Sequence, residues 1–514
     1  MSIKTFVSFG FEGSIVSADV NISAGTEQAV NIHGLADSAV KDVCDCTRSA
    51  IENSGYTMPE GVTDVILSPV DIKKSASEVG LAVALAVLQA QKNVSKTVNV
   101  MVYGALGLSG SITPLRGTYV ALATAKSQGI SYAIIPEGTE KVPDGLRVVY
   151  VKNLVEAFNA LCDIESGKYL EAFTKGFITD MDSGITFKPL SAGERPVTEM
   201  VAADASKTGL VYAVILAAAG RLNILAYGPP GCGKSEALQG LSQFAPNLIS
   251  TEQESVNRIY SIAGLTKPGS KIVYRPFRIP HQTASIEGIC GGGVDCRPGE
   301  ITLAHKGTLF LDEAAEFKTS VLQMLRVPLE SRTITLSRAG RSTVYPADFQ
   351  LAMATNPCPC GNYGSKDKVC LCSAKSIEQY WKKFTTPLLD RVAIRYNCNR
   401  NIEPYGIDYV KDFEHVRNAV ITAVKCQYYR QSKMNGELTP EEVKEHCKMT
   451  DRARAILDEA IVNKGLSPRA VDNILRTART ILDVQGFAHS IIGTPSITKA
   501  LELYGDLTEV YAIG

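Results

Sequence analysis

The chain has 514 residues, of which 45% are hydrophobic and 21% charged, as in globular proteins with ample core, and this length suggests roughly three domains. Basic and acidic residues number 53 each, so the net charge is zero and any binding to nucleic acid must depend on local basic groups. We find no secretory signal, and the apolar runs at 79–88 and 210–220 are too short to span a bilayer, which predicts a cytoplasmic protein without a membrane partner.

The first 175 residues alternate β-prone and helical runs and predict a separate mixed domain. Strands are expected at 6–11, 16–22, 29–32, 63–67, 98–103, 133–135 and 148–151, and helices at 38–53, 79–91 and 120–128. Residues 176–197 combine glycine, proline and charged residues with little periodicity, so we expect a linker there.

The most informative segment is Gly228–Ser235, which reads GPPGCGKS and fits the phosphate-loop pattern G-x-x-x-x-G-K-[ST]. An apolar run at 222–227 predicts a strand before it, and 236–244 is expected to be helical. Lys234 would reach the β- and γ-phosphates of ATP, and Ser235 would ligate Mg²⁺. The glycines let backbone N–H groups turn toward one anion at a helix start, so the loop residues expected to cradle the phosphates are Gly228, Pro229, Pro230, Gly231, Cys232 and Gly233.

A second motif lies at Thr308–Glu313, where TLFLDE is a mostly apolar run that ends in two carboxylates. A buried parallel strand that ends this way delivers its acidic groups to one edge of a sheet. Asp312 would hold Mg²⁺ directly or through water, and Glu313 would orient and deprotonate the water that attacks ATP. The alternative is a strand followed by the acidic start of a helix.

A third predicted strand, 349–355, ends in Asn356, whose amide would sense the γ-phosphate or position the attacking water. The three motifs in this order predict a parallel α/β nucleotide-binding domain.

Between the first two motifs, 275–300 holds three prolines and a run of glycines and is expected to be an inserted loop or hairpin. His281 in this insert is interpreted as a loop residue rather than a nucleotide sensor.

Two β-prone runs, 333–336 and 342–345, flank Ser-Arg-Ala-Gly-Arg and predict a hairpin with Gly340 at its turn. Arg338 and Arg341 would project near the tip. Repeated around a ring, such tips would form a basic collar that grips a phosphate backbone without reading its sequence. The alternative is that both arginines are solvated turn residues.

Four of the 13 cysteines are grouped, as Cys358-Pro-Cys360 and Cys370-Leu-Cys372. Four thiolates at this spacing, with glycines that allow tight turns, predict a closed tetrahedral Zn²⁺ site with a structural role. The alternatives are four free surface cysteines or a redox pair. The other nine have no such neighbours and are expected to be small buried hydrophobic residues: Cys44, Cys46, Cys162, Cys232, Cys290, Cys296, Cys398, Cys426 and Cys447.

Near the end of the chain, 387–392 reads PLLDRV, and Arg391 could reach the γ-phosphate of a neighbouring subunit or pair with Asp390 in its own chain.

From about residue 408 to 514 the chain is expected to be helical, with a good helix start at Ser467-Pro468. Arg469 lies in the first turn of that helix, where a cation opposes the helix dipole. It is therefore a candidate second sensor of phosphate; the alternative is an exposed arginine.

The whole chain resembles the ComM/YifB family, a magnesium-chelatase-like branch of AAA+ ATPases. The motifs that carry the resemblance are RPFRIPHQTAS (275–285), GGGVDCRPGEITLAHKGTLFLDE (291–313), NPCPCGNYG (356–364) and PLLDRV (387–392). The resemblance implies an α/β architecture in three parts: an N-terminal Lon-protease-like α+β domain of the ribosomal S5 type 2-like fold (1–175), an AAA+ P-loop core with hairpin inserts and a four-cysteine loop (198–404, with the loop at 356–373), and a C-terminal helical lid (405–514).

The resemblance also implies a function. It suggests a homo-hexameric ATPase that acts on single-stranded or branched DNA independently of sequence, as in branch migration during natural transformation or recombination. ATP, Mg²⁺ and structural Zn²⁺ would be its cofactors. By motif position, Arg391 matches an arginine finger acting on the neighbouring subunit, and Arg469 matches the lid sensor.

The Lon-like resemblance raises the possibility of a Ser/Lys peptidase. Glu78 occupies the position of the nucleophile, with Ser77 one residue away, and Tyr119 occupies that of the lysine, with no lysine until Lys126. We therefore expect no peptidase activity. Two other functions compete with a DNA motor: a chelatase-like ATPase that remodels protein rather than DNA, and a scaffold that only binds ATP. The intact Lys234, Asp312 and Glu313 argue against the scaffold.

Overall fold

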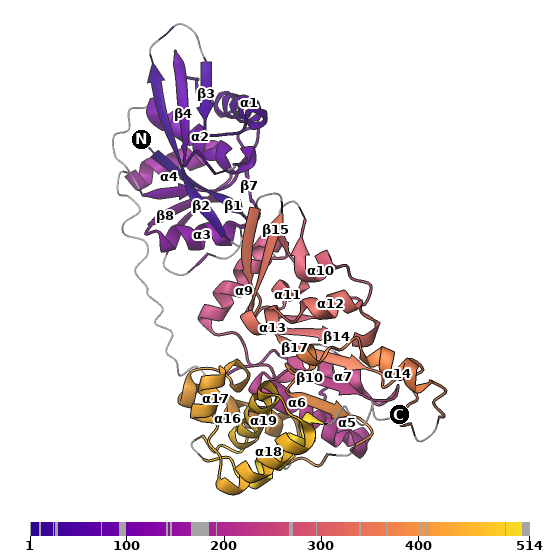
Figure 1. The fold of residues 1–514 in the computed structure, drawn as a ribbon. Helices are drawn as coiled ribbons and strands as arrows, with labels where there is room; N and C mark the ends of the chain where they lie inside the picture. The colour runs from indigo at the N-terminus through magenta and orange to yellow at the C-terminus, as the bar shows by residue number, and fades with distance from the viewer. Residues whose placement is uncertain are drawn as a thin grey trace.

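The computed structural model describes residues 2–9, 12–23, 25, 29–72, 74–91, 99–139, 142–143, 146–165, 185–191, 193–266, 271–293, 296–338, 341–365, 368–400, 402–407, 410, 412–488 and 490–505. The molecule is elongated, with an N-terminal α/β unit at one end, a second α/β unit in the middle and a group of C-terminal helices at the other end (Figure 1). In the described parts, no helix is long and apolar enough to cross a membrane.

The N-terminal unit is built on a mixed sheet of seven strands in the order β3-β4-β2-β1-β5-β8-β9. Strand β2 is antiparallel to β1 and β4, and the other neighbours are parallel. All seven predicted strands are present, although the first begins earlier than expected. They are β1 (Ser2–Phe9), β2 (Glu12–Ser23), β3 (Ala29–His33), β4 (Val62–Ser68), β5 (Val100–Val102), β8 (Tyr132–Pro136) and β9 (Arg147–Val151); a small ladder joins β6 (Ala105–Leu106) to β7 (Ile112–Thr113).

Helices pack on both faces of this sheet. Val7 of β1 packs in one hydrophobic cluster with α2, whereas its neighbour Phe6 packs in another with α3, because successive side chains of a strand point to opposite faces. Helix α2 also contacts α1 and α4, so it is buried almost all round, which explains its uniformly apolar sequence. The helices are α1 (Asp37–Asn53), α2 (Ala76–Gln91), α3 (Thr118–Ser127) and α4 (Leu154–Glu165).

The middle unit contains a parallel sheet of five strands in the order β11-β14-β17-β10-β18. Every residue of β10, β14 and β17 is buried, as expected for parallel strands covered on both faces. The three strands predicted to carry the motifs are therefore adjacent. The five strands are β10 (Ile224–Tyr227), β11 (Phe277–Arg278), β14 (Thr308–Leu311), β17 (Gln350–Thr355) and β18 (Ile394–Asn397).

Short helices and two hairpins surround this sheet. The predicted insert at 275–300 is confirmed as broken structure, with the short ladder of β12 (Gly291–Gly292) and β13 (Arg297–Pro298). The predicted hairpin is β15 (Thr333–Arg338) and β16 (Arg341–Pro346). The helices are α5 (Glu199–Ala203), α6 (Thr208–Gly220), α7 (Lys234–Gln239), α8 (Leu241–Phe244), α9 (Ser250–Ala263), α10 (Ile286–Cys290), α11 (Glu300–Leu303), α12 (Thr319–Met324), α13 (Pro328–Ser331), α14 (Ala374–Trp381) and α15 (Thr386–Leu389).

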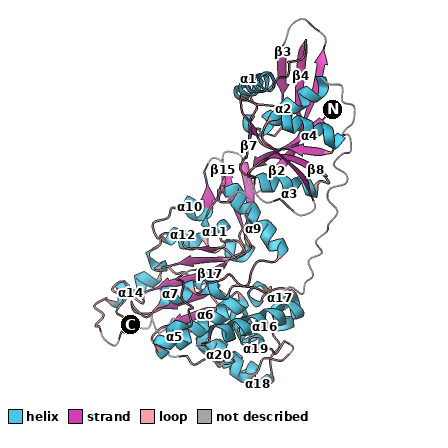
Figure 2. Ribbon diagram, turned by 180° about the vertical axis from the view of Figure 1, so that it is seen from behind, coloured by secondary structure: helices cyan, strands magenta, loops and turns pink. Residues whose placement is uncertain are grey.

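The C-terminal part is helical, in contrast to the α/β units above it (Figure 2). This confirms the predicted helical character over 412–488 and 490–505. Ser467 caps α19 by accepting a hydrogen bond from the Ala470 amide, as expected from the sequence. The apolar faces of these helices share one hydrophobic core with α6 of the middle unit. The helices are α16 (Phe413–Gln431), α17 (Pro440–His446), α18 (Asp451–Lys464), α19 (Pro468–Asp483) and α20 (Thr494–Tyr504).

Two local expectations need revision. The helix predicted at 236–244 is interrupted at Gly240, where a β-carbon would lie 2.6 Å from the Cβ of Val197. Part of the predicted linker also contacts the middle unit, since Phe187 bridges to Pro246 and Val197 is buried in the core. Residues 176–184 and 192 lie outside the described residues, so the linker there stays a prediction.

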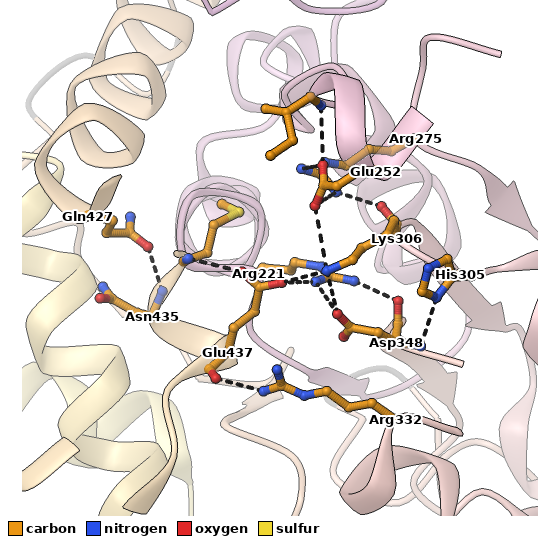
Figure 3. A network of polar contacts seen from close by, with 12 residues as sticks. Arg221, Glu252, Arg275, His305, Lys306, Arg332, Asp348, Gln427, Asn435 and Glu437 are labelled. Carbon is orange, nitrogen blue, oxygen red and sulfur yellow. Dashed lines mark hydrogen bonds and ion pairs between the residues drawn. The ribbon is translucent and has the colours of Figure 1, made fainter. Parts of the chain in front are cut away.

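A buried cluster of charges joins the middle unit to the C-terminal helices (Figure 3). Arg221 Nη1 lies 3.2 Å from Asp348 Oδ2 and also pairs with Glu437. Lys306 Nζ lies 2.7 Å from Asp348 Oδ2 and 3.3 Å from Glu437 Oε1. Arg221, Lys306 and Asp348 each precede a strand of the sheet, whereas Glu437 ends the turn between α16 and α17. The cluster thus fastens the C-terminal helices to the amino ends of the strands.

Electrostatic attraction outweighs the cost of burial in this cluster. Burial opposes the charge on Arg221, yet Asp348 and Glu437 keep the pKa of its guanidinium above the usual value. Burial would raise the pKa of Asp348, but Arg221 and Lys306 hold it well below its usual range. Beside them, burial lowers the pKa of His305 to about 3, so its ring is neutral and its Nδ1 accepts a hydrogen bond from the Asp348 amide.

Candidate functional site

The candidate site lies where β10, β14 and β17 end. The three strands are parallel neighbours, so the residues that follow them meet at one edge of the sheet. The loop after β10 turns at Gly231 and Gly233, whose φ angles of 85° and 83° lie in the left-handed region that favours glycine. The two glycines of the sequence pattern thus adopt the left-handed backbone that the turn requires, and α7 begins directly after the loop at Lys234.

Lys234 is nearly buried, and its ammonium group lies on the loop itself. Nζ donates hydrogen bonds to the carbonyl oxygens of Gly228 at 2.7 Å and Pro229 at 2.8 Å. It also lies 3.5 Å from Oδ1 of Asn356, the residue that follows β17. The structure therefore brings together the lysine and the amide that the sequence predicted to contact the γ-phosphate.

The two predicted magnesium ligands are in direct contact. Ser235 Oγ donates a hydrogen bond of 2.7 Å to Asp312 Oδ1, across 77 residues of sequence. A hydroxyl and a carboxylate held at this distance are suitable oxygen ligands for Mg²⁺, which is bound through few protein groups together with phosphate oxygens. The residues present therefore fit a magnesium–nucleotide complex.

Glu313 is exposed and has a left-handed backbone, with φ of 49°. Its Oε2 accepts a hydrogen bond of 2.6 Å from Nε2 of Gln282, a residue that the sequence did not single out. His281, the neighbour that was considered instead, bonds Thr283 at 2.8 Å, consistent with its interpretation as a loop residue. Gln282 thus holds the carboxylate that is expected to activate water.

Arg391 and Arg469 both pair with Glu330 of α13. Arg391 does not pair with Asp390, the alternative that the sequence left open; Asp390 instead accepts a hydrogen bond of 3.0 Å from Ser467, near Arg469. Arg391 precedes β18 and so lies at the amino ends of the strands, whereas the phosphate loop follows β10 at their carboxyl ends. At about 3.3 Å per residue, four-residue strands separate these two edges by roughly 10 Å. The two arginines therefore lie together, at the other end of the sheet from the phosphate loop of their own chain.

The four grouped cysteines converge as predicted. Their sulfur atoms all lie within 4.8 Å of one another, with Cys358 3.4 Å from Cys360 and 3.6 Å from Cys370. Sulfurs bonded to one tetrahedral zinc at about 2.3 Å would be roughly 3.8 Å apart, so this donor set fits Zn²⁺. The loop also touches the phosphate loop, because a β-carbon on Gly361 would lie 3.1 Å from Cδ of Pro230.

The prediction for the other nine cysteines is only partly right. Cys290, Cys296, Cys426 and Cys447 are buried, but five are half-buried: Cys44, Cys46, Cys162, Cys232 and Cys398. Cys232 belongs to the phosphate loop, and Lys234 Nζ lies 3.6 Å from its sulfur.

The residues at the peptidase positions form a structural contact. Glu78 is buried, and its carboxylate accepts hydrogen bonds from the Ser8 amide and hydroxyl and from Ser75. Lys126 is exposed at the end of α3. Ser77 has the hydroxyl of Ser75 as a neighbour at 3.2 Å.

The hairpin of β15 and β16 extends from the middle unit toward the N-terminal unit (Figures 1 and 2). Arg338 and Arg341 form the last backbone pair of its ladder. Gly340, the predicted turn residue, lies outside the described residues.

The sequence matches three family descriptions: "Subunit ChlI of Mg-chelatase" at 18–139, "Magnesium chelatase, subunit ChlI" at 204–404, and "Magnesium chelatase, subunit ChlI C-terminal" at 411–503. The uncharacterized protein YifB of Escherichia coli is 31% identical over 490 residues, which cover 94% of this chain and 93% of YifB. The chain belongs to the ComM/YifB family. Competence protein ComM of Haemophilus influenzae is 29% identical over 503 residues, 96% of this chain and 95% of ComM. An uncharacterized protein of Mycobacterium tuberculosis is 32% identical over 490 residues, 93% of each chain.

Membership in the ComM/YifB family and the geometry of the site agree. This family member is a magnesium-chelatase-like ATPase of the AAA+ type. Lys234, Ser235 and Asp312 lie at the sheet edge where we expect its nucleotide.

We expect Gln282→Ala to raise ATP turnover in the absence of DNA by roughly two- to tenfold. The hydrogen bond from Gln282 occupies one oxygen of the Glu313 carboxylate, and its loss frees that oxygen to bind water. Steady-state phosphate release measures the effect. His281→Ala is the matched control, because that ring bonds Thr283. Lower turnover in Gln282→Ala alone would mean that Gln282 positions Glu313 for catalysis.

Proposed function

We propose that this protein is an ATP-driven motor that translocates on or remodels DNA as a homo-hexamer, with branch migration in natural transformation or recombination as its setting. The observation that carries the proposal is that Lys234, Ser235, Asp312 and Glu313 meet at one sheet edge, in a chain similar to competence protein ComM over nearly its full length.

ATP hydrolysis follows from the roles of the residues. The loop amides and Lys234 would bind the phosphates, and Ser235 and Asp312 would hold Mg²⁺, which would supply positive charge to stabilise the phosphates. Glu313 takes a proton from water as the water attacks, and Asn356 orients that water or contacts the γ-phosphate. Gln282 releases Glu313 for this step.

The two arginines complete the site of the neighbouring subunit in this proposal. Arg391 and Arg469 lie at the opposite end of the sheet from their own phosphate loop, and a ring brings one edge of each subunit against the other edge of the next. Glu330, whose side chain is 56% exposed, holds both arginines until a phosphate competes for them. An arginine finger of this kind contributes on the order of 10³–10⁵ in rate.

The hairpin and the N-terminal unit are the proposed contacts to DNA. Arg338 and Arg341 would grip the phosphate backbone, since the strands of the hairpin extend toward the N-terminal unit. That unit, assigned by resemblance to the Lon-protease-like fold, would serve assembly or DNA entry, since Glu78 is engaged in structural contacts. The C-terminal helices would act as the lid of the AAA+ core.

Zinc is the third proposed cofactor. Cys358, Cys360, Cys370 and Cys372 would bind it with four thiolates, which leave no position open for water, so its role would be structural. The zinc loop follows Asn356 directly and touches the phosphate loop at Pro230. Zinc would therefore order the segment that places Asn356.

A second candidate is a chelatase-like ATPase that remodels a protein partner rather than DNA. The three magnesium-chelatase family matches favour it. It differs from the first candidate in one respect: DNA would not change its rate of hydrolysis.

ATP hydrolysis measured with and without branched or single-stranded DNA tests the proposal. We expect stimulation by DNA in the native protein. We expect Glu313→Gln to lower turnover by about 10²–10⁴ while ATP still binds, because a general base contributes that much. ATP turnover that DNA does not change would favour the protein-remodelling candidate. So would an affinity for DNA that does not fall as the salt concentration rises.

Removal of zinc should change the fluorescence of Trp381, the single tryptophan of the chain. Its Nε1 donates a hydrogen bond of 2.9 Å to the Pro357 carbonyl, next to Cys358, and the ring is fully buried. A strong chelator should release one zinc per chain and shift the emission of Trp381 to longer wavelength as water enters. Zinc-free protein with unchanged emission, or native protein without zinc by metal analysis, would contradict this site.

A further inference from the structure

The phosphate loop has a second cysteine beside it. Cys232 lies in the loop, and Cys398 follows β18, the strand hydrogen-bonded to β10. The Cys398 amide donates a hydrogen bond of 2.8 Å to the Tyr227 carbonyl, which places Cys398 next to Gly228. A β-carbon on Gly228 would lie 3.4 Å from the sulfur of Cys398 and 3.5 Å from that of Cys232. The absence of a side chain at Gly228 lets the two sulfurs approach each other.

The two thiols differ in reactivity. A hydrogen bond from Cys398 and the nearby Lys234 ammonium lower the pKa of Cys232 to about 6, against the opposing effect of burial. The hydrogen bond to Cys232 and burial raise the pKa of Cys398 well above its usual value. Cys232 is half-buried, and it is the thiolate of the pair near neutral pH.

We propose that Cys232 and Cys398 form a reversible redox site, in which a hydroperoxide joins them in a disulfide that disables the phosphate loop. The Cys232 thiolate attacks one oxygen of hydrogen peroxide, which breaks the O–O bond, gives a sulfenic acid and, after protonation, releases water. The Cys398 sulfur then attacks the Cys232 sulfur, loses its proton and expels a second water. Two thiols are oxidised by two electrons while one peroxide is reduced to two waters.

The disulfide would change the loop in two ways. It draws the sulfurs to about 2.05 Å, closer than hydrogen-bonded thiols, and so pulls the backbone of Cys232 toward β18. It also removes the thiolate that faces Lys234. Since misplacement of about 1 Å in a catalytic site costs up to 10²-fold, ATP turnover should fall by roughly 10–10²-fold.

The test treats the full-length, zinc-loaded protein with hydrogen peroxide and follows peptides and turnover together, without DNA. We expect a Cys232–Cys398 cross-linked peptide by mass spectrometry, a parallel loss of basal ATP turnover, and recovery of both with dithiothreitol. Because the readouts need no DNA, failure of the DNA-motor proposal would not affect them.

Two variants sharpen the test. Cys398→Ser should retain basal turnover and, under peroxide, accumulate a sulfenic acid at Cys232 that dimedone traps, with no cross-link. Cys162→Ser, which changes a half-buried cysteine of the N-terminal unit, should still form the cross-link. The proposal is overturned if peroxide cross-links only the four grouped cysteines, or if the Cys232–Cys398 disulfide forms while turnover stays unchanged.

Discussion

The ion pairs of Arg221 with Asp348 and Glu437 are the interaction on which the arrangement of this molecule depends. They lie at the amino ends of the parallel strands. Three of the charged residues there precede strands, and the fourth, Glu437, belongs to the C-terminal helical part. Breaking one partner of such a buried pair typically costs about 3–5 kcal/mol, since it leaves the other charge uncompensated. The sheet therefore has two specialised edges, one that anchors the helices and one that carries the proposed hydrolytic residues.

This division has a consequence for catalysis. Arg391 and Arg221 line the same cavity, and Asp390 bonds both Ser467 and Asn473 of the α19 region, so the anchored helices fix the two arginines at the amino edge. The phosphate loop, Asp312 and Asn356 lie at the carboxyl edge. In the proposed assignment, a single chain holds the groups that would bind ATP and activate water at one edge of the sheet, and Arg391 and Arg469 at the other edge. A ring of copies is the simplest assembly that unites them.

The sequence was a good guide to whatever depends on local pattern. The phosphate loop, the strand that ends in Asp312 and Glu313, the hairpin and the Ser467 cap have strong local signals, and all are present in the structure. The cysteine cluster could also be predicted, because its ligands lie close along the chain.

Contacts between distant segments could not be predicted in this way. Gln282 and Glu313 meet only because β11 and β14 are adjacent strands, and Cys232 meets Cys398 only because β18 pairs with β10. Arg221 and Glu437 are 216 residues apart, and nothing in the local sequence of either one marks the other as its partner. The order of strands in a sheet brings such residues together, and hydrophobic periodicity does not reveal that order.

The most direct test of a shared site mixes two inactive variants. Lys234→Ala lacks the phosphate-binding lysine but keeps Arg391, whereas Arg391→Ala lacks the arginine but keeps Lys234. Each variant should form rings, as measured by light scattering, and hydrolyse ATP poorly. In equal mixture, an intact loop faces an intact arginine at roughly a quarter of the interfaces of a head-to-tail ring, so turnover should recover toward a quarter of the native rate. A mixture no more active than the average of its two components would contradict completion of the site by a neighbouring subunit.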